Sequence, residues 1–244
     1  MLATAARLTD VTPFVERKQY FVLHAPRQTG KTTAMRGLAE QLRAQGIAAC
    51  WVTLERCQGI EDLERAEPLW LQALHQWSRD LPERWRAPDS APFRAEAEGG
   101  RLGAYLRAWA SAVDVPLVLL LDEADVVSGA ALVSLLRQLR DGFMDRGVGR
   151  FPTCVALIGM RDLRDYVTQA KDGRAVNPGS PFNIKAASIT LRNFDAREVG
   201  ELLSQHTAET GQSFLPEAVE EIARVTDGVL SPFRQDTRAC GNRV

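Results

Sequence analysis

The chain has 244 residues, of which 45% are hydrophobic and 25% charged, and 30 basic residues nearly balance 31 acidic ones. This is an ordinary globular composition, with enough apolar residues for a substantial core. The formal net charge of −1 gives no general attraction for a polyanion, so bulk electrostatics do not favour nucleic-acid binding. The four cysteines and three histidines stand at no zinc-binding spacing. Without a signal peptide or an apolar run of ~20 residues, we expect a cytoplasmic protein.

Short β-rich runs alternate with amphipathic helices along most of the chain. Strands are predicted at 20–24, 47–54, 115–121, 153–158 and 184–191. Helices are predicted at 31–46, 61–81, 101–113 and 130–143, a surface loop at 82–92 and a further loop at 172–182. The alternation is typical of a parallel sheet covered by helices on both faces, and the apolar run at 115–121 suits a central buried strand.

The last part of the chain changes to a purely helical pattern. Helices are predicted at 195–207 and 216–225, with Asn193 or Asp195 as a cap and Pro216 in a first turn. We therefore divide the chain into an α/β core at 1–192, a partial helical lid at 193–227 and a tail at 228–244. The tail has few apolar residues and no helical period, so we expect it to be disordered or truncated.

The first motif follows the strand at 20–24 directly. It reads Ala25, Pro26, Arg27, Gln28, Thr29, Gly30, Lys31, Thr32, Thr33. In the P-loop template (Walker A), backbone N–H groups and a helix N-terminus surround the phosphates of a nucleotide. Here Lys31 would contact the β- and γ-phosphates, Thr32 would bind Mg²⁺ and Thr33 would approach the α-phosphate. Ala25 replaces the first glycine of the template, which matters only if that position needs a positive φ. An ordinary loop at a helix start is the alternative.

The second motif is an acidic pair, Asp122 and Glu123, at the carboxyl end of the apolar strand. Open α/β sheets bind their ligands at this edge. Asp122 suits the Mg²⁺-binding role of a Walker B aspartate, and Glu123 suits orienting the water that attacks ATP. The alternative is that Asp122 only caps the following turn. Together with the P-loop, the pair predicts a P-loop NTPase of about five strands in the order 5-1-4-3-2, with the 153–158 strand inserted beside the P-loop strand.

Two further sets of residues stay undecided. Arg161 and Asp162 follow the inserted strand, where a polar side chain can sense the γ-phosphate, but a helix cap by Asp162 with a solvated Arg161 explains them equally well. Candidate arginine fingers for a neighbouring subunit are Arg140, Arg146, Arg150 and Arg164. The tryptophans at 70, 77, 85 and 109 are read as packing residues, because no regular basic residues lie between them.

In these motifs, residues 10–226 resemble the bacterial AAA-like ATPases of the additional-strand, catalytic-glutamate class, related to the archaeal-ATPase and STAND groups. A Pro-Arg-Gln-Thr-Gly-Lys-Thr segment like 26–32 is usual in that class. The replacement of the first template glycine by Ala25 therefore weighs less against the P-loop assignment. The strings 120–125 and 159–166 resemble the Walker B and post-strand segments of that class. At 226–228 the sequence departs, since another apolar lid helix is expected there; the end at Val244 looks truncated or frame-altered.

The resemblance implies Mg²⁺-dependent ATP binding, hydrolysis, and use of the nucleotide state to move the lid or a protein partner. One alternative is a nucleotide-dependent switch with little or no hydrolysis, favoured by the short lid and opposed by Glu123. Another is a DNA-associated loader-type ATPase, opposed by the near-neutral charge. A P-loop kinase fits least, because Asp122 and Glu123 stand together and no acceptor lid is evident.

Overall fold

The computed structural model describes residues 7, 11–26, 29–147, 149–160 and 185–229. Its strands are β1 (Tyr20–His24), β2 (Ala48–Thr53), β3 (Leu117–Asp122), β4 (Cys154–Gly159) and β5 (Lys185–Thr190). Its helices are α1 (Thr12–Glu16), α2 (Lys31–Ala44), α3 (Leu63–Trp77), α4 (Arg101–Ala112), α5 (Gly129–Met144), α7 (Ala196–Thr210) and α8 (Pro216–Thr226). Every strand and helix expected from the sequence is present, with ends shifted by a few residues. The loop expected at 172–182 lies outside the described residues.

The five strands form one sheet in the order β2-β3-β4-β1-β5, and every neighbouring pair is parallel. Read from the other edge, this is the predicted order 5-1-4-3-2, with β4 between β1 and β3. The register places His24 beside Gly159 and Thr53 beside Asp122. The carboxyl ends of four strands therefore meet along one edge of the sheet, where ligands of such sheets bind.

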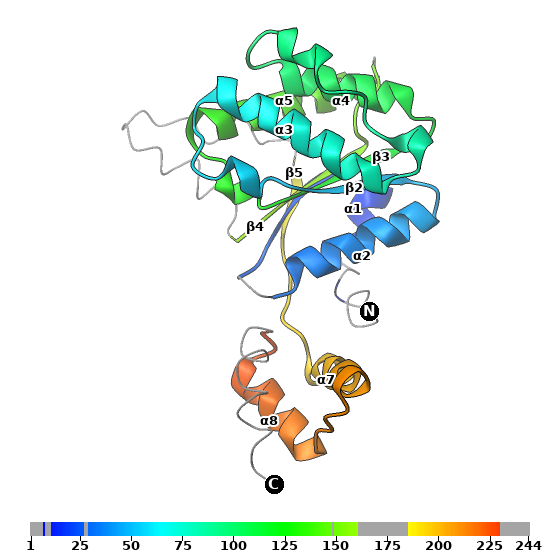
Figure 1. The fold of residues 1–244 in the computed structure, drawn as a ribbon, viewed down its shortest axis with the longest axis vertical. Helices are drawn as coiled ribbons and strands as arrows, with labels where there is room; N and C mark the ends of the chain where they lie inside the picture. Colours follow the sequence, from blue (N-terminus) through cyan, green and yellow to red (C-terminus); the bar gives the residue numbers. More distant parts are fainter. Residues whose placement is uncertain (1–6, 8–10, 27–28, 148, 161–184, 230–244) are drawn as a thin grey trace.

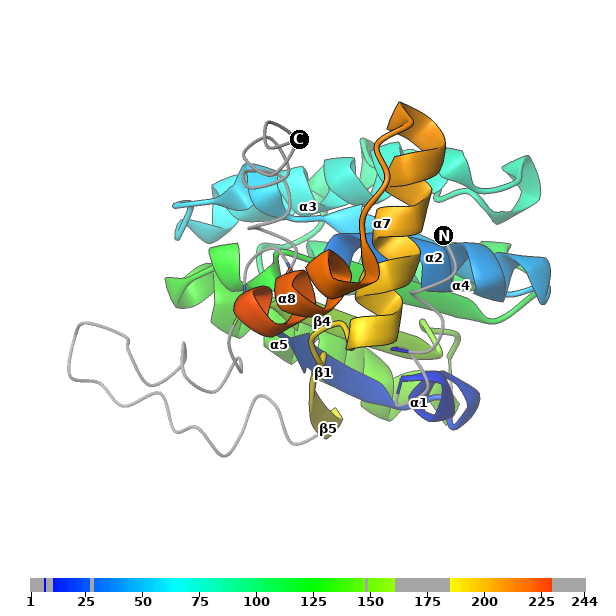
Figure 2. The same cartoon turned by 90° about the horizontal axis from the view of Figure 1, so that it is seen from below.

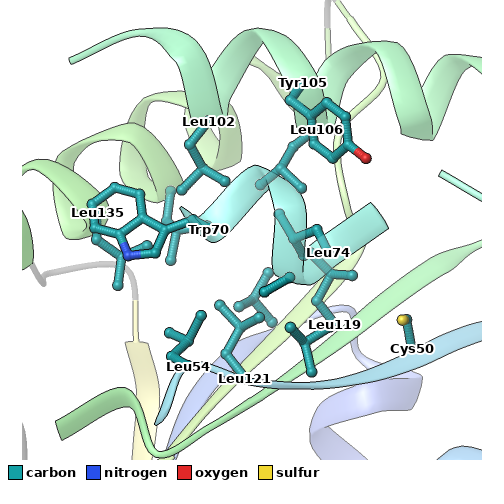
Figure 3. Packing of buried hydrophobic residues seen from close by; sticks show 14 of the residues in the cluster. Cys50, Leu54, Trp70, Leu74, Leu102, Tyr105, Leu106, Leu119, Leu121 and Leu135 are labelled. Atoms are coloured by element: carbon teal, nitrogen blue, oxygen red, sulfur yellow. The ribbon is translucent and has the colours of Figure 1, made fainter. Parts of the chain in front are cut away.

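Helices cover both faces of the sheet (Figure 1): α3, α4 and α5 lie on one face, and α1 and α2 on the other. Strand side chains alternate between the two faces. For example, Leu119 and Leu121 point toward α3 and α4, whereas Val118 and Leu120 point toward α2. Figure 3 shows the first face, where Trp70 and Leu74 of α3 fill the space between the strands and α4. Strand β3 lies between β2 and β4 and is buried along its whole length, as its apolar run predicts.

The segment at 82–92 is mostly exposed, as its prolines suggested, but it also contributes to the core. Trp85 is only 4% exposed and belongs to the core beneath α4. Its carbonyl accepts a hydrogen bond from Trp109 Nε1 at 2.9 Å, and the carbonyl of Pro88 accepts one from the hydroxyl of Tyr105, also at 2.9 Å. The prolines stop regular structure, but the apolar residues between them still pack inward because burial of a large aromatic ring is favourable.

The two C-terminal helices, α7 and α8, form a separate unit that the chain reaches through β5 (Figures 1 and 2), and we name them the helical pair. Asp195 caps α7 in a capping box with Glu198, which confirms one of the two expected caps. Pro216 occupies the first turn of α8. Just after α8, Gly228 is buried and its carbonyl accepts from Phe194 N at 3.1 Å. Across the described part of the chain, no helix is long and apolar enough to span a membrane.

Candidate nucleotide site

The P-loop joins β1 to α2. Gly30 has φ 76°, a left-handed conformation that glycine adopts without strain, and α2 begins at the next residue. Ala25 is fully buried and is absent from the described non-glycine residues with positive φ, so its methyl group costs nothing in backbone strain. Thr29 is also buried, and its hydroxyl donates to the carbonyl of Pro26 at 3.0 Å, closing the loop on itself. The P-loop is therefore a tight turn that leads directly into the N-terminus of α2.

Lys31 lies inside this turn. Its side chain is 8% exposed, and its ammonium group donates to the carbonyls of Ala25 and Pro26, both at 2.7 Å. Backbone carbonyls that hold an ammonium at the start of a helix keep a positive charge where phosphates are expected to lie. The predicted phosphate-binding role of Lys31 is consistent with this placement and stays a prediction.

Thr32 and Asp122 meet although they are 90 positions apart. The Thr32 hydroxyl donates to Asp122 Oδ2 at 2.7 Å, and Asp122 is 1% exposed. A second donor to the same oxygen, Trp51 Nε1, lies 3.2 Å away on β2. The sequence reasoning missed Trp51, and its position on a β-rich run two residues before the strand end was the available signal. Thr33 is exposed on the first turn of α2.

Glu123 begins the turn after β3 with φ 55° and ψ 37°. A non-glycine residue in this left-handed region costs roughly 1–2 kcal/mol, and such strain is concentrated at functional sites. Its backbone N–H donates to Asp122 Oδ1 at 3.0 Å. Burial raises the pKa of the Glu123 carboxyl, the nearby charges of Asp122 and Asp125 raise it further, and Lys31 opposes them. Asp122 therefore does more than cap a turn, since its carboxylate contacts the P-loop helix as well.

Asp125 connects this turn to the end of β4. Its Oδ2 accepts from the backbone N–H of Met160 at 3.0 Å. A Cβ on Gly159 would lie only 3.0 Å from the Asp125 carboxyl carbon, so a larger residue there would displace the carboxylate by a few tenths of an ångström. The sequence predicts no separate role for Asp125, which stands in the Walker B-like segment 120–125. This contact ties the segment after β4, where the expected sensor residues lie, to the acidic turn.

Several predicted site residues lie outside the described residues: Arg27, Gln28, Arg161, Asp162 and the candidate finger Arg164. Among the other candidate fingers, Arg146 donates to the carbonyls of Lys18 and Thr153 at 2.7 and 3.0 Å. Arg150 donates to the carbonyl of Val113 at 3.1 Å. Both lie near the amino ends of the strands, opposite the P-loop.

The donor set suits Mg²⁺. A hydroxyl and a carboxylate oxygen come together at one point, and hard oxygen donors are what this ion prefers. In the described residues there is no cluster of three or more His, Cys, Asp or Glu side chains able to hold a metal by itself. Mg²⁺ usually takes one or two protein ligands and completes its shell with phosphates and water. Thr32 and Asp122 therefore fit a magnesium ion that arrives with a nucleotide.

A parallel sheet in this order, with a P-loop after β1 and an acidic pair after β3, defines a P-loop NTPase. The model of the AAA domain family matches residues 15–167, which is more than half of the chain. The protein therefore belongs to the AAA domain family. It is an AAA-like P-loop ATPase domain with the ATP-binding fold of that family. No curated protein matches the chain.

Solved structures share this fold at low sequence identity. The Walker-type ATPase PABY2304 of Pyrococcus abyssi has a TM-score of 0.67 and 12% identity over 94% of this chain and 65% of its own. Drosophila ORC bound to poly(dA/dT) DNA and Cdc6 has a TM-score of 0.52 and 15% identity over 83% and 31%. The replication initiator DnaA bound to AMPPCP and single-stranded DNA has a TM-score of 0.50 and 13% identity over 96% and 62%. The chain thus spans about two thirds or less of each of these proteins, and the likeness concerns the fold alone.

Proposed function

We propose that the protein binds ATP with Mg²⁺ at the carboxyl edge of the sheet and hydrolyses it. The contact between the Thr32 hydroxyl and Asp122 Oδ2 at 2.7 Å carries this proposal, because it brings both predicted metal ligands together beside the P-loop. Lys31 supplies the positive charge for the β- and γ-phosphates. The remaining loop residues, including Pro26, Arg27, Gln28, Thr29, Gly30 and Thr33, surround the nucleotide.

Bound Mg²⁺ would neutralise phosphate charge and orient the terminal phosphate for attack. The residues of the chain do the rest. Thr32 and Asp122 hold the metal, and Glu123 accepts a hydrogen bond from the attacking water and receives its proton. Glu123 follows Asp122 directly and has a left-handed backbone conformation. Arg161 or Asp162 remains our candidate for sensing the γ-phosphate.

We further propose that the nucleotide state moves the helical pair, at 193–229, or an unidentified protein partner. Support comes from the connection through β5, whose last residues lie beside β1: Leu191 N donates to the carbonyl of His24 at 3.0 Å, next to the P-loop. A change in the P-loop can therefore be transmitted to the N-terminus of α7 through the pairing of β1 with β5. Two structural neighbours are named with bound DNA. We do not propose DNA as a ligand of this chain, because its net charge is −1.

Lys31→Ala tests the nucleotide site. We expect ATP affinity to fall roughly 100-fold or more, because charge-assisted contacts to phosphate are lost. Lys18→Ala is the matched control, since Lys18 is exposed before β1 at the opposite end of the sheet. Equilibrium binding of a fluorescent ATP analogue measures both variants. Unchanged affinity in Lys31→Ala would overturn the site assignment.

Glu123→Gln separates an ATPase from a nucleotide-dependent switch. We expect binding to persist and turnover to fall about 100-fold or more, the usual loss for a missing general base. Glu55→Gln is the matched control, because Glu55 is an exposed carboxylate beside the same site. Steady-state phosphate release measures both. Full turnover in Glu123→Gln would remove Glu123 from the mechanism, and negligible turnover in the unmodified protein would favour the switch.

A further inference from the structure

Trp51 lies on the edge strand β2 and faces α2. It is 6% exposed, and its indole Nε1 donates to Asp122 Oδ2 at 3.2 Å. A buried indole N–H usually finds some acceptor, and a backbone carbonyl is enough, as Trp109 shows by donating to the carbonyl of Trp85. Trp51 instead contacts the carboxylate that we assign to the metal.

The contacts of Asp122 fix its orientation. Oδ2 accepts from Thr32 Oγ1 and from Trp51 Nε1, whereas Oδ1 accepts from the backbone N–H of Glu123 at 3.0 Å. A carboxylate oxygen has about two lone-pair sites, so these donors occupy Oδ2 and leave one site on Oδ1. The carboxylate is held in one plane by three elements: β2, α2 and the turn after β3.

The ring of Trp51 is itself held from outside. The guanidinium of Arg36 lies 4.1 Å from the ring centroid, and Trp77 packs against the ring edge-on with centroids 4.7 Å apart. Arg36 stands one helical turn after Thr32 on α2, so one face of this helix supplies the donor Thr32 and contacts the other donor, Trp51. The three side chains line a hollow at the open edge of the sheet, together with Glu40, Arg43 and Asp80.

We propose that Trp51 is a positioning residue for the magnesium site: its N–H orients the Asp122 carboxylate, and Arg36 holds its ring. This rests on the proposed function. An oriented carboxylate accepts the metal without first losing rotational freedom, so removal of the indole N–H weakens the response to Mg²⁺ and leaves nucleotide contacts intact.

Trp51→Phe removes the N–H and keeps an aromatic ring against Arg36. The quantity measured is the Kd of a fluorescent ADP analogue, with Mg²⁺ and with EDTA. We expect the Mg²⁺-dependent gain in affinity to shrink about tenfold, the effect of one hydrogen bond to a charged group. The Kd in EDTA should change less than about twofold. Trp109→Phe is the control, because it removes another buried indole N–H, whose acceptor is the carbonyl of Trp85 and not Asp122.

The outcomes are distinguishable. Absence of nucleotide binding by the unmodified protein would refute the proposed function and, with it, this inference. Mg²⁺-dependent binding that is the same in folded Trp51→Phe would overturn the positioning role alone, as would equal losses with Mg²⁺ and EDTA. If Trp51→Phe does not fold, Arg36→Ala decides, since Arg36 is exposed. We expect it to reduce the Mg²⁺ gain about twofold to threefold, and an unchanged gain would overturn the proposal.

Discussion

The sheet and the helical pair are stabilised in different ways. The sheet lies between two large apolar clusters that contain most of the buried side chains. The helical pair has a small cluster with three buried members, Phe194, Val199 and Leu203, and α8 buries none of its residues. Polar contacts supply much of its order: Glu198 is fully buried, and Arg192 donates to its two oxygens at 2.7 and 2.8 Å.

The attachment of the helical pair also depends on polar groups. The Arg7 side chain, 3% exposed, donates from Nε to the carbonyl of Arg192 at 3.0 Å and lies 3.9 Å from the ring centroid of Phe194. Burial lowers the pKa of Arg7 to about 10, with Glu198 opposing and Arg192 adding to the shift. We infer that the pair opens at a lower free energy than the sheet, as elements with few buried apolar contacts do.

Of the substitutions that test this contrast between the sheet and the helical pair, Trp70→Ala should reduce the free energy of unfolding most. Trp70 is 1% exposed between α3 and the sheet, and removal of a buried tryptophan costs about 3–5 kcal/mol of unfolding free energy. Urea denaturation followed by circular dichroism measures the loss. Leu215→Ala is the control in the helical pair, since Leu215 is 73% exposed and should change stability by less than about 0.5 kcal/mol. A loss below about 1 kcal/mol in Trp70→Ala would contradict the description of this core.

Gly228→Ala should destabilise the helical pair and leave the sheet intact. Gly228 has φ +68°, and a Cβ there would lie 1.9 Å from the carbonyl oxygen of Phe194. Left-handed strain and the clash together should cost roughly 2–4 kcal/mol locally. Gly211→Ala is the matched control, because Gly211 has φ +79° and nothing within 4 Å of the same Cβ. Hydrogen exchange of α7 and β3 amides measures both, and equal effects of the two substitutions would contradict the prediction.

The sequence predicts the sheet well because its signals are local. The apolar run at 20–24 matches β1 residue for residue, and the glycine–lysine–threonine segment marks the start of α2. The strand order was predicted from the single strand at 47–54 between the P-loop and Asp122, which suggested that the 153–158 strand is inserted beside the P-loop strand. The burial of Trp85 agrees with its interpretation as a packing residue. The prolines around it indicate a loop, and only the tertiary packing beneath α4 shows which part of this loop is covered.

The site was predictable in composition but not in its supporting contacts. Lys31, Thr32, Asp122 and Glu123 carry motif signals, whereas Trp51 contacts Asp122 only because the register places Thr53 beside Asp122. The left-handed backbone conformation at Glu123 was not predictable, because no glycine at this position indicates a positive φ. The contact of Arg7 with Arg192 joins residues 185 positions apart and has no periodic signal. Such contacts depend on register and packing, which one sequence does not state.

Arg192→Ala should also lower the opening free energy of the helical pair, by less than Gly228→Ala does. It leaves the buried carboxylate of Glu198 without its bidentate partner, a loss of about 1.5–3 kcal/mol for a hydrogen-bonded charge. Arg224→Ala is the matched control, since Arg224 makes the same kind of paired contact with Glu221 on the exposed surface of α8. We expect no measurable change there, because exposed ion pairs contribute little. Hydrogen exchange of α7 measures both, and equal responses would refute the distinction.

The smallest expected effect is the response of the helical pair to acid. Burial alone would raise the pKa of Glu198, but hydrogen bonds from Arg192 and from the backbone of Asp195 outweigh it and hold the pKa below its ordinary value. The unfolded pair therefore binds a proton more readily than the folded one. This contribution to stability is fully present above the ordinary glutamate pKa of about 4.3 and is lost as the pH falls through the folded value.

Amide NMR spectra recorded from about pH 6 to pH 3 should thus show α7 resonances changing before those of β3, whose strand is buried by apolar contacts. Glu198→Gln should remove this acid-dependent step for α7, because the amide does not titrate. Glu221→Gln should leave the step in place, since Glu221 lies on the exposed surface of α8. A step that persists unchanged in Glu198→Gln would show that another group controls the pair, and the contrast with the sheet would then rest on apolar contacts alone.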